Sequence, residues 1–230
     1  RWTTMDALRA GHRCAVKQLE PGLYGVGTEP RFGIGQRALL VRTPVGNVLW
    51  DCVPLLDDAI VDIVRALGGL VAIAVSHPHF YTSMVEWAHA FEVPVLLHAA
   101  DRAWVMRPDP SITYWEGDTR ALGDGLTLVR CGGHFEGSTV LHWAGGAEGR
   151  GALLTGDTIQ LLADAGWVSF MRSYPNLVPL SAASVRAIAG AVRPFAFDRM
   201  YGGWWDLCVE HDAARVLDRS VERYVEAIGG

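Results

Sequence analysis

Short apolar runs alternate along this chain with turn residues and with longer amphipathic stretches. Apolar or β-branched runs of about 4–8 residues bounded by Gly, Pro or Asp are typical of strands, and longer runs with a helical period predict helices. The pattern predicts strands over residues 23–26, 38–41, 48–50, 70–75, 95–98, 126–131, 139–143, 152–155 and 195–200. It predicts helices over residues 57–67, 83–91, 100–106, 181–192 and 212–228. Residues 159–179 show no clear period and are predicted to be irregular.

The order of these elements indicates the fold class. Strands come first and are followed by mixed strands and helices, and the second half of the chain starts over with strands. This order predicts an α/β protein in which two sheets are covered by helices. With 230 residues and 50% hydrophobic content, the chain is long enough for a single domain over residues 1–230 with a full core. No linker or internal repeat interrupts it.

Composition argues against several classes of function. The net charge of -5 disfavours a nucleic-acid partner, and no run approaches the ~18 apolar residues of a membrane span. No secretory signal is visible, although the first residue is Arg1 and a preceding segment could have been removed. The cysteines Cys14, Cys52, Cys131 and Cys208 are far apart without CxxC spacing, which predicts reduced thiols in a cytoplasmic protein. The oligomeric state is not indicated.

Three segments carry candidate metal ligands. His77 and His79 follow a predicted apolar strand, so both imidazoles can turn toward one point. His134 lies in a glycine-rich turn, and Asp157 follows a second apolar strand. Imidazole is the commonest ligand of zinc and also suits iron, copper and nickel. Each signal is weak alone, but their order along the chain and their positions at strand ends predict a metal site.

With these motifs, the chain resembles the metallo-β-lactamase superfamily, over residues 22–226. That superfamily has His-x-His-x-Asp-His after a strand, then a Gly-His turn, an Asp after a strand, and a late His. His77, His79, His134 and Asp157 match four of these positions. The resemblance implies a four-layer αββα sandwich of two mixed sheets flanked by helices. It also implies that the three histidines bind a first metal ion, with Asp157 as a fourth ligand.

The sequence departs from the family at the second metal site. Tyr81 and Thr82 stand where the family has Asp and His, and residues 198–205 contain no histidine. A phenol titrates near ~10 and is a poor ligand at neutral pH. We therefore expect one metal ion, zinc in the first place, with iron as the alternative.

The predicted ligands indicate the chemistry. A zinc ion held by three histidines lowers the pKa of its bound water to about 7, which supplies a hydroxide nucleophile. Asp157 either ligates the metal or accepts a proton from this water. Tyr81 is a candidate hydrogen-bond donor to a developing oxyanion.

Several tryptophans are candidates for the wall of a substrate pocket. Trp115, Trp167, Trp204 and Trp205 lie in segments that read as loops. They could form a flat slot for an acyl, aryl or lactone group, or they could cover the open edges of the sheets. The sequence does not distinguish the two roles.

The leading function is a hydrolase that acts on a small-molecule ester, thioester or lactone through a single metal ion. An iron-dependent oxygenase is the second candidate, because two histidines and a carboxylate make the facial triad of non-haem iron enzymes. A non-catalytic member of the fold that binds a ligand is the third. Neither nucleic acid nor membrane is expected as a partner.

Overall fold

The computed structural model describes residues 3–229, which cluster into two compact units. The first unit runs to Leu97 and includes Val105–Tyr114, and the second contains His98–Trp104 and the chain from Trp115 onward. The expected single domain over residues 1–230 stays a prediction, and Arg1, Trp2 and Gly230 lie outside the described residues.

The first unit is built on a seven-stranded sheet in which the strands follow chain order. Its strands are β1 (Arg13–Glu20), β2 (Leu23–Glu29), β3 (Arg37–Val41), β4 (Val48–Trp50), β5 (Ala72–Ala74), β6 (Val95–His98) and β7 (Ile112–Trp115). Strands β1 to β4 pair antiparallel as a meander, whereas β4, β5 and β6 are parallel. The carboxyl ends of β4 and β5 therefore lie side by side, at the same end of these two inner strands.

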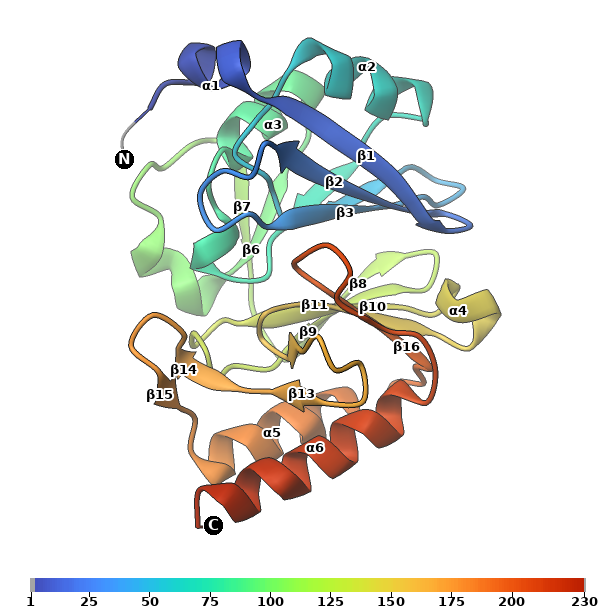
Figure 1. Ribbon diagram of the computed structural model, residues 1–230. Coiled ribbons are helices and arrows are strands. Elements are labelled where there is room, and N and C mark those ends of the chain that lie inside the picture. The colour runs from blue at the N-terminus through green and yellow to red at the C-terminus, as the bar shows by residue number, and fades with distance from the viewer. Residues whose placement is uncertain (1–2, 230) are drawn as a thin grey trace. The chain divides into compact units, whose positions relative to one another are not determined.

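The helices of this unit are α1 (Met5–Gly11), α2 (Asp58–Ala66) and α3 (Met84–Phe91), with a short 3-10 turn η1 (Pro78–Phe80) before α3. Helix α1 precedes β1, whereas α2 and α3 connect the parallel strands. Asp57 caps α2, because its carboxylate accepts the backbone N–H of Ile60 at 2.8 Å. Successive crossovers through α2 and α3 have the same hand, so both helices cover the same face of the sheet (Figure 1).

The second unit contains a six-stranded mixed sheet in the order β17-β16-β11-β10-β9-β8. Its strands are β8 (Thr119–Gly123), β9 (Leu126–Arg130), β10 (Thr139–Trp143), β11 (Ala152–Gly156), β16 (Arg199–Gly202) and β17 (Cys208–Val209). Two short hairpins pair β12 (Gln160–Leu161) with β13 (Val168–Ser169) and β14 (Met171–Ser173) with β15 (Val178–Pro179).

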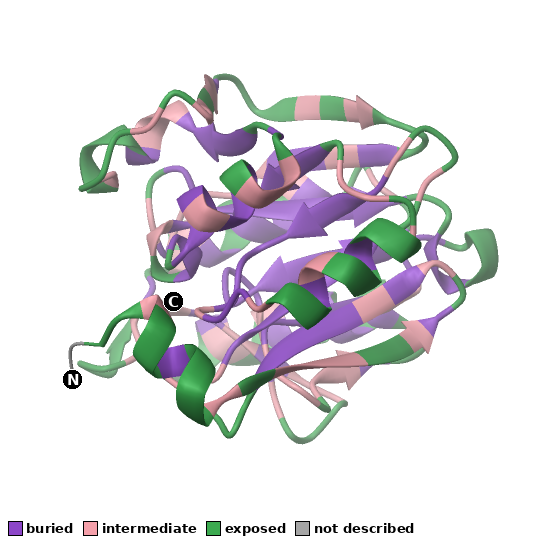
Figure 2. Cartoon of the chain, turned by 90° about the horizontal axis from the view of Figure 1, so that it is seen from above, coloured by how far each residue is buried: buried purple, intermediate pink, exposed green. Residues whose placement is uncertain are grey.

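Two long helices pack against this second sheet. The helices of the unit are η2 (Ala99–Trp104), α4 (Gly146–Gly149), α5 (Ala182–Val192) and α6 (Ala213–Ala227). Helices α5 and α6 lie side by side (Figure 1), and their apolar faces share a core with the sheet. Val185, Ile188 and Phe170 are fully buried in this core. Figure 2 shows buried residues along the strands and exposed residues on the outer faces of the helices.

Most predicted elements are confirmed, and three strands have the predicted bounds, at residues 48–50, 95–98 and 139–143. The strand predicted over 195–200 is wrong in its first part, because β16 begins at Arg199. The carbonyl of Ala196 accepts a hydrogen bond from the His142 side chain instead of joining a ladder. The predicted helix over 100–106 is a 3-10 turn that ends at Trp104.

The pattern also missed short or polar elements. Residues 159–179 contain four strands of two or three residues each, too short to show a period. Strand β1 was missed because its polar and apolar residues do not alternate regularly, as expected of a strand at the edge of a sheet. The predicted α/β class, with two large mixed sheets and helices, is confirmed. Among the helices of residues 3–229, none has both the length and the apolar character needed to cross a membrane.

Candidate functional site

In the first unit, His77 and His79 lie in the turn that follows β5. His77 has extended backbone and precedes η1, in which Pro78 occupies the first position. The two imidazoles are 5.2 Å apart between centroids and nearly perpendicular. The Nδ1 atom of His77 accepts the backbone N–H of His79 at 3.3 Å, a long hydrogen bond that restrains the ring. His77 is buried and His79 is exposed.

A buried aspartate at the end of the neighbouring strand holds the start of this turn. The Oδ1 atom of Asp51 accepts the backbone N–H of Ser76 at 2.7 Å, and Ser76 directly precedes His77. Asp51 has a left-handed backbone with φ of 62°, which aims its side chain across to the next strand. Sequence reasoning missed Asp51. Its position directly after the apolar strand β4 was the available signal.

In the second unit, His134 is fixed in one tautomer by a backbone carbonyl. Its Nδ1 atom lies 2.9 Å from the carbonyl oxygen of Met171, which can only accept, so Nδ1 carries the proton. The Nε2 atom of the neutral ring is then the atom with the lone pair. This is the arrangement seen in metal-ligating histidines, which donate their other ring N–H to a carbonyl or carboxylate.

Asp157 lies beside His134 in the same unit. It follows β11, and its Oδ1 atom is 4.0 Å from Nε2 of His134, with both side chains almost fully buried. Ligands of zinc lie about 2.0–2.2 Å from the ion, so two ligands of one ion are separated by at most ~4.3 Å. The 4.0 Å distance is within this limit and too long for a hydrogen bond.

The turn that carries His134 is held from two sides. The buried Asp101, in η2, accepts the backbone N–H of Gly137 through Oδ1 at 2.8 Å. Arg172 donates from one guanidinium nitrogen to the carbonyls of Gly133 and His134, at 3.2 and 2.8 Å. Gly133 has φ of 81°, and a Cβ there would lie 2.8 Å from the side chain of Ile188. Only glycine allows this approach of the turn to α5.

Tyr174 is close to both His134 and Asp157. Its hydroxyl donates to the carbonyl oxygen of Asp157 at 3.1 Å, and its ring lies 5.4 Å from that of His134. Burial, reinforced by the charge of Asp157, raises the pKa of the Tyr174 phenol well above its usual range. Tyr174 is therefore a neutral donor. Sequence reasoning missed it, because residues 159–179 gave no period that could place it.

Tyr81, the predicted oxyanion donor, belongs to the first unit. It is buried, and its backbone N–H closes η1 on Pro78. Thr82, which follows, is exposed. The catalytic role of Tyr81 stays a prediction.

The four tryptophans predicted to line a pocket have different surroundings. Trp115 is buried and packs edge-to-face on His98, with ring centroids 4.6 Å apart. The guanidinium groups of Arg219 and Arg223, on α6, lie over the ring of Trp167. Trp204 and Trp205 are partly buried in the connection between β16 and β17. A role of these four in substrate binding stays a prediction.

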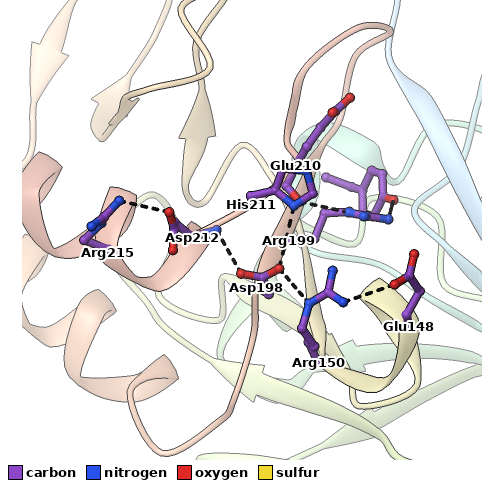
Figure 3. Close-up of polar contacts among 9 residues, drawn as sticks. Glu148, Arg150, Asp198, Arg199, Glu210, His211, Asp212 and Arg215 are labelled. Carbon is purple, nitrogen blue, oxygen red and sulfur yellow. Dashed lines mark hydrogen bonds and ion pairs between the residues drawn. The ribbon is translucent and has the colours of Figure 1, made fainter.

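A network of charged side chains lies around Asp198, in the region where the resemblance to the metallo-β-lactamases led us to look for a late histidine (Figure 3). Asp198 accepts from Nε of Arg150 at 2.9 Å and from the backbone N–H of Asp212 at 2.9 Å. His211, the next histidine in the chain, is largely exposed and faces this same carboxylate at 3.9 Å. The contacts of Asp198 join the start of β16 to the start of α6, which is a structural role.

Solved structures identify the fold. The chain is similar to the DIM-1 metallo-β-lactamase, with 15% identity and a TM-score of 0.70, over 94% of this chain and 99% of that one. It is similar to TMB-1 at 16% identity and a TM-score of 0.68, with coverage of 94% and 99%. A metallo-β-lactamase from Cronobacter sakazakii with a HARLDQ motif matches at 18% identity and a TM-score of 0.57, with coverage of 96% and 95%. The chain thus has the metallo-β-lactamase fold, as its motifs predicted.

Sequence comparison identifies the family within this fold. The uncharacterized protein YmaE of Bacillus subtilis is 47% identical over 229 residues, which cover 99% of this chain and 83% of YmaE. The chain belongs to the same family as YmaE. No protein-family model matches it.

Proposed function

We propose that this protein is a metal-dependent hydrolase that uses one metal ion, bound by His77, His79, His134 and Asp157. The observation that carries the proposal is the geometry of His134 and Asp157. His134 keeps its proton on Nδ1, and its Nε2 atom and the Asp157 carboxylate are separated by a distance that suits two ligands of one ion. The metallo-β-lactamase fold supports hydrolysis as the reaction class.

The chemistry of these residues fits a divalent transition metal. Three imidazoles and one carboxylate are a donor set that suits zinc or iron. In each unit a buried aspartate fixes the backbone of a turn that carries ligands, through Asp51 in the first and Asp101 in the second. Such fixed geometry lowers the cost of ordering ligands when an ion binds.

A bound ion would act as a Lewis acid toward a carbonyl and would lower the pKa of a water molecule. The remaining roles belong to the chain. The Asp157 carboxylate is positioned to ligate the ion or to accept a proton. The backbone carbonyl of Asp157 accepts a hydrogen bond from the Tyr174 hydroxyl. We propose a small ester, thioester or lactone as the substrate, zinc as the ion, and Tyr81 as a hydrogen-bond donor to the substrate oxygen.

Elemental analysis of protein purified without added metal tests this proposal. We expect near one equivalent of zinc in the wild type and loss of the ion in His79→Ala and His134→Ala. His211→Ala is the matched control, because this exposed histidine faces Asp198, which is not among the proposed ligands, and the variant should keep the ion. Near-stoichiometric iron would favour the oxygenase instead. Full metal occupancy in both ligand variants would refute the ligand assignment.

Activity is tested separately on a panel of lactones, thioesters and aryl esters. Hydrolysis that is lost on chelation and restored by zinc supports the reaction class. A wild type that binds zinc but cleaves none of these substrates would contradict it. None of the four cysteines forms a disulfide within residues 3–229, and we propose a cytoplasmic location for a protein with such reduced thiols.

A further inference from the structure

Two aromatic rings extend outward from His134 in the second unit. Phe135 packs edge-to-face against the His134 imidazole, with ring centroids 5.0 Å apart. Trp104, the last residue of η2, packs edge-to-face on Phe135 with centroids 5.3 Å apart. We call Trp104 and Phe135 the aromatic step. The three rings form a continuous series that begins at a proposed metal ligand.

The outer ring of this step is open to solvent. Trp104 is 55% exposed and Phe135 is partly exposed. A single exposed aromatic side chain is common on protein surfaces and by itself indicates no site. The backbone that carries Trp104, however, is anchored, because η2 also carries the buried Asp101, which accepts a hydrogen bond from the His134 turn. Two contacts therefore link η2 to the segment that carries His134, the Asp101 hydrogen bond to Gly137 and the packing of Trp104 on Phe135.

We propose that the aromatic step binds the apolar acyl or aryl group of the substrate. This inference rests on the proposed function. It narrows the substrate class to esters or thioesters whose acyl or aryl group is large and uncharged, as opposed to acetyl or charged groups. In this proposal, the substituent of a carbonyl that reacts beside His134 would contact Phe135, and a longer substituent would extend to Trp104. Flat aromatic faces contribute a large contact area at little entropic cost.

The test is the dependence of kcat/KM on chain length for p-nitrophenyl acetate, butyrate and hexanoate. In the wild type we expect kcat/KM to rise roughly twofold per added methylene, about half the free energy of full burial, because the step covers one side of the chain. In Trp104→Ala the rise should disappear, with little change for the acetate and unchanged metal content. Trp104→Phe should keep most of the rise. An equal loss on all three esters, or none, would overturn the proposal.

Met106→Ala is the matched control. It removes another exposed apolar side chain, 88% exposed, two residues along the chain. It should keep the wild-type dependence on chain length. A flat dependence in this variant would mean that general surface adsorption causes the effect, and the aromatic step would be rejected.

Binding of uncleaved analogues separates this inference from the proposed function. Hexanamide should bind more tightly than acetamide to the wild type, and Trp104→Ala should abolish the difference by calorimetry. If no ester is cleaved but this difference is found, the hydrolase proposal fails and the aromatic step stands. If the wild type binds both amides equally, the aromatic step is wrong whatever the activity.

Discussion

Asp101 offers a sharp test of how the second unit holds His134. Asp101 is 1% exposed, and its carboxylate accepts the Gly137 N–H at 2.8 Å. A buried hydrogen bond to a charged group contributes about 1.5–3 kcal/mol, and a buried N–H that loses its partner costs a similar amount. Both figures describe the loss of the same hydrogen bond and are not added together. Asp101→Ala should therefore lower the free energy of unfolding by roughly 2–3 kcal/mol. Asp101→Asn keeps an acceptor oxygen and should cost only about 1 kcal/mol.

For a chain of this size, that loss corresponds to a fall in Tm of roughly 4–12 °C. Calorimetry on metal-free protein measures it without involving the proposed site. Zinc affinity, measured by competition with a chelator, should also fall, by about tenfold, because the His134 turn loses a fixed contact. The matched control is Asp109→Ala in the first unit, where the carboxylate likewise accepts a backbone N–H, that of Ser111 at 2.9 Å. If Asp101→Ala and this control changed zinc affinity equally, Asp101 would not position the turn.

Two further predictions concern titrating groups. Hydrogen bonds from the hydroxyl and backbone of Ser111 hold the pKa of Asp109 at about 2. Because this pKa is lowered on folding, its contribution to stability is present above about pH 4 and is lost as the pH falls toward 2. Ser111→Ala should raise this pKa, as followed by carboxyl NMR, and an unchanged pKa would contradict the assignment. Burial raises the pKa of the Cys131 thiol to about 12, so iodoacetamide at pH 8 should alkylate it far more slowly in native than in denatured protein. Mass spectrometry gives the two rates, and equal rates would show that Cys131 is accessible as thiolate.

The candidate ligands at the strand ends could be predicted from sequence because each apolar run is followed by a residue that can bind a metal ion. His77 follows β5 and Asp157 follows β11 in this way, and a carboxylate or imidazole directly after a buried strand stands out in the pattern. His134 was found through its two glycines, which have positive φ. The local sequence therefore identified all four candidate ligands.

Residues that contact the candidate site from distant parts of the sequence leave no comparable pattern in the sequence around them. The carbonyl of Met171 that fixes the His134 tautomer comes from β14, a three-residue strand without a readable pattern. Trp104 was assigned only to a short helix, because its contact with Phe135 joins residues 31 positions apart, as their residue numbers show. Trp115 was predicted to line a pocket because it lies in a loop-like segment; it is buried against His98, and its role in substrate binding stays a prediction.

The two units use the same device to hold their candidate ligands. In each, a buried aspartate from a neighbouring element accepts a backbone N–H of the ligand-bearing segment, Asp51 from Ser76 and Asp101 from Gly137. A carboxylate desolvated in this way is costly unless its hydrogen bonds are made, so each bond strongly favours one backbone position. Since neither aspartate is among the candidate ligands, their substitution should reduce metal affinity while leaving all four ligands in place. The two effects should be additive if the units hold their ligands independently, because the aspartates act on different turns. If the double variant lost much more binding free energy for the metal than the two single variants together, the two turns would be coupled.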